Sequence, residues 1–124
     1  MSASARKFEY ATLAFGGLYQ LGAGLAYLER VGVPRIEAHV TGLAARLRQG
    51  LADRGFGLLT PPSNGSAIVS FTSTRPEAVA RRVFADAGIA VTIRENGTMV
   101  RVSPALFNTA AEIDALLEAC ERLV

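Results

Sequence analysis

Two short apolar and β-branched runs, Ile89–Arg94 and Thr98–Ser103, flank the tripeptide Glu95-Asn96-Gly97 and limit the fold of this chain more than any other feature. Asparagine followed by glycine tolerates the positive φ angles that tight hairpins require. The sequence therefore predicts two strands joined by a hairpin. A small, mainly antiparallel sheet then forms the centre of the fold.

Four other segments have the spacing of helices. The first, Leu13–Val31, has leucines on one face and glycines over much of the rest, which favours a helix packed closely between other surfaces. The second begins at Pro34. The third and fourth follow Thr74-Arg75-Pro76-Glu77 and Thr109-Ala110-Ala111-Glu112, and both tetrapeptides have the spacing of a capping box. The apolar anchors expected for the third helix are Val79, Val83 and Phe84.

Two further strands are predicted at Phe56–Thr60 and Ser66–Ser73. The predicted order is ααββαββα, with two N-terminal helices followed by a small, mainly antiparallel sheet covered by helices. This is an α+β fold, and 124 residues are enough for one domain with a core. We expect residues 1–31 to form an N-terminal segment with a glycine-rich helix, and residues 32–124 to form the domain.

Charge and composition exclude several classes of protein. The net charge is only +2, from 13 basic and 11 acidic residues, and the basic residues are scattered rather than gathered in a stripe, so nucleic-acid binding is not expected. The uncharged run 11–28 approaches the length of a membrane span, but its glycines, Tyr19 and Gln20 favour burial against protein. A single cysteine excludes an internal disulfide and suits the cytoplasm.

No complete active site is evident in the sequence. His39 lies in the middle of a predicted helix without a cysteine or second histidine nearby, so we interpret it as a surface or packing residue. Cys120 lies on the apolar stripe of the last helix, where a cysteine behaves as a small hydrophobic residue. We therefore expect neither a metal site nor a catalytic cysteine.

Arg101 is the strongest candidate for a binding residue. Alternation along its strand places Val100 and Val102 on one face, and Met99, Arg101 and Ser103 on the other. A guanidinium group binds a carboxylate through two parallel hydrogen bonds. Two other interpretations remain open from the pattern alone: an ion pair with a structural Asp or Glu, and a solvated position on the sheet.

Three features together resemble the C-terminal region of the class V aminotransferases. They are Arg6–Thr12, the glycine-dotted helix, and Val100–Pro104 followed by Asn108-Thr109. Class V aminotransferases are fold-type I pyridoxal-phosphate-dependent enzymes that include cysteine desulfurases and isopenicillin-epimerase-like proteins. The resemblance extends over nearly the whole chain in the same order, and it implies an aminotransferase small-domain fold.

The resemblance also implies roles for individual residues. Arg101 matches the arginine that binds the substrate α-carboxylate. Thr12, with Phe8 and Glu9, matches the segment that reaches the cofactor phosphate, although Ala11 stands where glycine is usual. The implied cofactor is pyridoxal phosphate in the intact parent enzyme, and the implied substrate is an amino acid.

Other parts of the family pattern are missing. The Schiff-base lysine lies in the family's large domain, and Lys7 has no comparable setting. We therefore expect this chain alone to be inactive and to need a missing large domain, with self-association or homodimerisation through the first helix. Desulfurases carry a catalytic cysteine between the two hairpin strands, where this chain has only Glu95-Asn96-Gly97, so a desulfurase is disfavoured. The alternatives are a free-standing amino-acid-binding or regulatory module, and a structural domain that dimerises through its first helix.

Overall fold

The computed structural model describes residues 14–94 and 97–123. The chain separates into two compact units, Met1–Val33 and Pro34–Val124, which are described separately. None of the helices within the described residues is long and apolar enough to cross a membrane.

The first unit contains helix α1, Phe15–Val31, close to the predicted range. Gly32 ends the helix with a φ of 92°, and its amide donates to the carbonyl oxygen of Leu28. No residue of α1 is buried, so the close packing that the sequence predicts is not supplied by this unit itself. Large apolar side chains are exposed along the helix: Phe15, Leu18, Tyr19, Leu21, Leu25, Tyr27 and Leu28.

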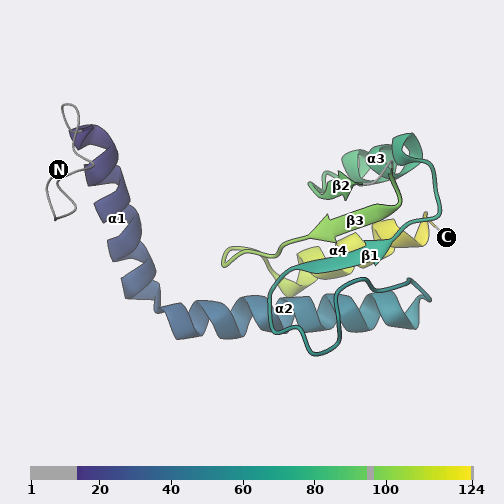
Figure 1. Ribbon diagram of the computed structural model, residues 1–124, viewed down its shortest axis with the longest axis horizontal. Helices are drawn as coiled ribbons and strands as arrows, with labels where there is room; N and C mark the ends of the chain where they lie inside the picture. Colours follow the sequence, from purple (N-terminus) through teal and green to yellow (C-terminus); the bar gives the residue numbers. More distant parts are fainter. Residues whose placement is uncertain (1–13, 95–96, 124) are drawn as a thin grey trace, which may run out of the picture. The chain divides into compact units, whose positions relative to one another are not determined.

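The second unit is a three-stranded sheet with helices, which confirms the predicted α+β fold (Figure 1). Its elements, in chain order, are α2 (Val33–Asp53), β1 (Val69–Thr72), α3 (Glu77–Asp86), β2 (Thr92–Arg94), β3 (Met99–Val102) and α4 (Ala110–Glu121).

The sheet has the order β1-β3-β2, and both pairings are antiparallel. The predicted hairpin is confirmed by the pairing of Arg94 with Met99. Gly97 in this hairpin has a φ of 95°, and a Cβ atom there would lie 2.6 Å from the backbone nitrogen of Glu77. Glycine is therefore required at this position both for the turn and for the close approach to the start of α3.

Alternate residues of the strands point into one hydrophobic core, which α2, α3 and α4 complete. Gly50 of α2 lies so close to Leu117 of α4 that a Cβ atom would overlap the leucine side chain. Val83 and Phe84 are buried as predicted, but Val79 is 42% exposed, so its prediction as a core anchor is wrong. The buried side chains of the strands and of α4 are Val69, Phe71, Ile93, Val100, Val102, Ile113, Leu116, Leu117, Ala119 and Cys120.

The segment Phe56–Thr60, which the sequence predicts as a strand, runs beside β1 and pairs with it through a single bridge between Leu58 and Phe71. The amides of Leu59 and Thr60 both donate to the carbonyl oxygen of Ser70, at 2.8 and 3.2 Å. Two successive amides on one carbonyl break the alternation of an antiparallel ladder, so the pairing does not extend into a regular strand.

The two predicted capping boxes have different outcomes. At α4, the amide of Glu112 donates to Thr109 Oγ1 at 3.3 Å, and the amide of Thr109 donates to the Glu112 carboxylate at 2.7 Å. At α3, the N-cap residue is Pro76 and no side chain caps the helix, so the prediction for Thr74 is wrong. Glu77 is the first helical residue there instead of the third, and its carboxylate accepts from Arg81.

Candidate functional site

The candidate site is the face of the sheet that points away from the core, here called the outer sheet face. The burial pattern of β3 alternates between partly or fully exposed residues and buried residues, as predicted. Arg101 is exposed on this face, whereas its neighbours Val100 and Val102 are buried. The strand residues of the outer sheet face are Ser70, Thr72, Thr92, Arg94, Met99 and Arg101.

Arg101 lies on the central strand with a hydroxyl-bearing residue on each side. It pairs with Ser70 of β1 and with Thr92 of β2. Within residues 14–94 and 97–123, no carboxylate forms an ion pair with Arg101. Of the interpretations left open by the sequence, the structural ion pair therefore finds no support in the described part of the chain, and an accessible guanidinium group remains.

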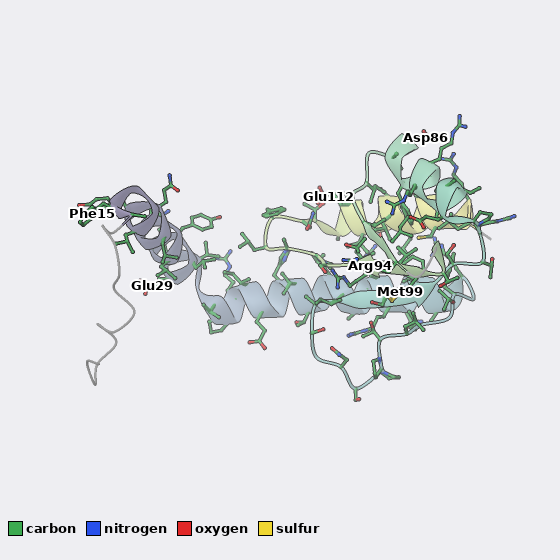
Figure 2. All side chains as sticks on the ribbon, turned by 45° about the horizontal axis from the view of Figure 1, so that its top comes forward. Phe15, Glu29, Asp86, Arg94, Met99 and Glu112 are labelled. Carbon is green, nitrogen blue, oxygen red and sulfur yellow. The ribbon has the colours of Figure 1, made fainter. Side chains whose placement is uncertain are left out.

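Arg94 is a second cation on the outer sheet face, and the sequence reasoning did not select it. It is the last residue of β2 and pairs with Met99 of β3; both are labelled in Figure 2. Because Thr92 pairs with Arg101, the register makes Arg94 the diagonal neighbour of Arg101. Alternation along the strand predicts that Arg94 is exposed, but its proximity to Arg101 follows only from the register of the hairpin.

The connector after β3 is held by specific hydrogen bonds. Asn108 Oδ1 accepts from the amide of Ala105 at 2.8 Å, and the carbonyl oxygen of Asn108 lies 2.9 Å from His39 Nε2 on α2. His39 is exposed and links two elements, so it has the packing role expected from the sequence. These contacts fix the chain directly after the strand that carries Arg101.

An open hollow of about 450 Å³ lies between the end of α3, this connector and the first turns of α4. Gly88, Ser103, Phe107 and Glu112 are among its lining residues, and Arg101 is not. Hydrogen bonds from Thr109 and Asn108 lower the pKa of Glu112, so its carboxylate is charged as part of the helix cap. None of the six strand residues of the outer sheet face lines this hollow.

The single thiol of this chain is not a candidate nucleophile. Cys120 is fully buried in the core, and desolvation raises its pKa to about 12. A thiol with such a pKa is almost entirely protonated at neutral pH. No cluster of metal-ligating side chains occurs among the residues that the structure describes.

The described residues do not make a pyridoxal-phosphate site by themselves. The family's cofactor binds covalently to a lysine, and residues 14–94 and 97–123 contain none. Lys7 and the expected phosphate-contacting residues Phe8, Glu9 and Thr12 lie outside the described residues. The outer sheet face can bind an anion, but it does not supply the amine on which cofactor chemistry depends.

Comparison with known proteins relates this chain to a family of larger enzymes. Residues 1–116 match the family described as Aminotransferase class-V. A probable cysteine desulfurase from Methanothermobacter thermautotrophicus is 31% identical over 134 residues, which cover 94% of this chain and 34% of that protein. Probable cysteine desulfurase 1 from Mycobacterium leprae is 32% identical, with 94% of this chain and 21% of that protein covered.

Solved structures have the same fold. The apo structure of a cysteine desulfurase from Thermococcus onnurineus NA1 matches with a TM-score of 0.87 and 27% identity, over 100% of this chain and 34% of that chain. Cysteine desulfurase CsdA from Escherichia coli matches with a TM-score of 0.85 and 24% identity, over 99% of this chain and 34% of that chain.

This chain thus spans about a third or less of the relatives that it matches, while the family match covers nearly all of its own length. The sequence resemblance and the α+β fold agree with that match. The chain belongs to the class V aminotransferase family of pyridoxal-phosphate-dependent enzymes.

Proposed function

We propose that this chain is the C-terminal small domain of a pyridoxal-phosphate-dependent class V aminotransferase-like enzyme that acts on an amino acid in the cytoplasm. Arg101 binds the substrate α-carboxylate, and Thr12 contributes to the cofactor site. Residues 1–31 contact the large domain or a partner subunit, and residues 32–124 form the small domain. Bound pyridoxal phosphate supplies the electron sink of the reaction, and its lysine comes from the large domain.

The exposed Arg101, which forms no ion pair with the residues that the structure describes, carries this proposal. Its position in the middle of a three-stranded sheet restricts the backbone, while its side chain stays available to a ligand. Ser70 and Thr92 beside it are uncharged, so neither neutralises the guanidinium group. A bidentate contact with a carboxylate orients an amino acid as well as binding it.

The type of reaction follows from the position of the only cysteine. The curated relatives are probable cysteine desulfurases. The family resemblance implies that desulfurases carry a catalytic cysteine between the two hairpin strands. This chain has no cysteine in that loop, and Cys120 is buried with a raised pKa. We therefore favour an aminotransferase, epimerase or lyase reaction that needs no protein thiol.

The first test adds pyridoxal phosphate to the purified chain and records its absorption spectrum with and without amino acids. We expect no stoichiometric band of bound cofactor and no transamination, because the described domain lacks the required lysine. A stoichiometric band with activity would overturn the claim that the chain is inactive alone. Calorimetry without cofactor is the companion measurement, and micromolar binding of a free amino acid would favour a free-standing binding module.

The second test concerns the apolar surface of α1. Side chains such as Leu21 and Tyr19 are 59% and 79% exposed, and patches of this kind mark interaction surfaces. We propose that a large domain or a second copy of the chain covers them. Sedimentation should show self-association of the full chain and a monomer after removal of residues 1–31. A strictly monomeric full chain would contradict the self-association.

A further inference from the structure

The outer sheet face has two arginines and no acidic residue in its strands. Arg94 and Arg101 come from neighbouring strands, and the remaining positions are Ser70, Thr72, Thr92 and Met99. Diagonal neighbours of this kind are about 7–8 Å apart, within reach of long side chains. The two guanidinium groups can therefore approach one ligand of the size of an amino acid.

These two arginines differ from most others of the same unit. Neither forms an ion pair within the described residues, and each has an exposed side chain. Salt bridges with Asp or Glu are formed by Arg46, Arg54, Arg81, Arg82 and Arg122. Two like charges held as diagonal neighbours, with no carboxylate partner among the described residues, repel each other, and an anionic ligand relieves that repulsion.

We propose that Arg94 and Arg101 together select an amino acid with an acidic side chain. Arg101 binds the α-carboxylate, and Arg94 binds the side-chain carboxylate. The role of Arg101 in this pair rests on the proposed function, whereas the role of Arg94 does not follow from it. The selected substrate class is therefore a dicarboxylic amino acid rather than a neutral one.

The register explains why two carboxylates are needed for the full interaction. A single carboxylate satisfies one guanidinium fork and leaves the second cation unpaired. A ligand with two carboxylates offers each fork its own partner. The hydroxyl groups of Ser70 and Thr92, on either side of Arg101, can donate to the same carboxylate.

The test is a titration of the nitrogen-15-labelled full chain, observed through the arginine Nε–H signals at constant ionic strength near neutral pH. L-glutamate and L-glutamine are the paired probes, because they have nearly the same shape and differ in the side-chain charge. In this cofactor-free chain we expect weak binding at millimolar concentrations, in which both amino acids shift the Arg101 signal and only glutamate shifts the Arg94 signal. Glutamate should bind roughly fivefold or more tightly than glutamine, in line with an added charge-assisted contact.

The variant Arg94→Gln should bind glutamate no more tightly than glutamine, while both amino acids still shift the Arg101 signal. Arg35→Gln is the matched control, because it removes the same charge from an exposed position on α2 and should keep the preference. The comparison of the two amino acids uses the unmodified chain, so it holds even where a variant does not fold.

Several results would overturn the inference. Equal affinities with no shift at Arg94 would remove the dicarboxylate preference and leave the proposed role of Arg101 intact. If Arg35→Gln lost as much of the preference for glutamate as Arg94→Gln does, the preference would reflect only the total positive charge of the chain. Equal shifts with sulfate would likewise show a nonspecific response to anions. The absence of any shift at Arg101 with either amino acid would refute the carboxylate role in the proposed function as well.

Discussion

The two faces of the sheet use alternate residues of the same strands for different purposes. On β3, Val100 and Val102 close the core, while Arg101 between them is exposed. On β2, Ile93 is buried and Arg94 is exposed. Because the side chains alternate, a change on one face need not disturb the other. Stability and ligand binding should therefore be separable by mutations at adjacent positions.

The inner sheet face, whose side chains point into the core, also depends on the register of the hairpin. A slip of one residue between β2 and β3 would move Arg101 into the core and Val100 to the surface. Burying an unpaired guanidinium group is far more costly than exposing a valine, so the register is strongly defined. The alternation that buries Ile93 and Val100 in the core therefore also keeps Arg94 and Arg101 exposed.

The largest expected effect comes from Phe71→Ala on the inner face. Phe71 is fully buried, and its ring packs edge-to-face against Phe56 with centroids 5.4 Å apart. We expect a loss of about 3–5 kcal/mol in the free energy of unfolding, measured by urea denaturation. The neighbouring outer-face variant Thr72→Ala should lose less than about 1 kcal/mol. Equal losses would contradict the division of roles between the faces.

A smaller effect comes from Cys120, which lies in the core beneath the sheet. Its pKa rises from an ordinary 9.0 to about 12 because burial disfavours the thiolate. The folded chain therefore binds this proton more tightly than the unfolded chain does, and the stabilisation is fully present below about pH 9. As the pH rises from about 9 toward 12, the free energy of unfolding should fall by about 1.4 kcal/mol per pH unit from this group.

Urea denaturation of the chain and of Cys120→Ala between pH 8 and 11 measures this contribution, since the variant lacks the titrating thiol. The difference between the two stability curves should slope downward above about pH 9. Parallel stability curves would show that the thiol ionises in the folded chain. Water would then reach Cys120 more readily than its burial indicates.

Local patterns predicted the fold wherever the deciding interaction lies within a few residues. The pairing of the two hairpin strands and the Thr109–Glu112 capping box are of this kind, and the structure confirms both. At α3, the sequence has the same spacing, but Pro76 occupies the cap position and shifts the helix start by two residues. At Phe56–Thr60, pairing depends on how a distant strand aligns, which local propensity does not specify.

The candidate site divides in the same way. Alternation along a single strand was sufficient to place Arg101 on the exposed face. Arg94 was missed because its significance depends on the cross-strand register, which makes it the diagonal neighbour of Arg101. Within residues 34–94 and 97–123, neither arginine has a carboxylate partner, and this property depends on the folded unit. No spacing in the sequence distinguishes them from Arg46 or Arg54, which are paired.

The smallest expected effect on stability belongs to Arg101→Gln. The side chain is exposed and forms no ion pair within the described residues, so its removal should change the free energy of unfolding by less than about 0.5 kcal/mol. The same variant lacks the Arg101 signal, so it is followed through the Arg94 Nε–H signal, whose response to L-glutamate should become much weaker because the α-carboxylate contact is lost. Val100→Ala is the control on the adjacent inner position, because it removes fully buried methyl groups and should destabilise the chain while leaving the Arg101 signal responsive. If Arg101→Gln unfolds the chain, Arg101 is part of the structure, and the outer sheet face is not an independent binding surface.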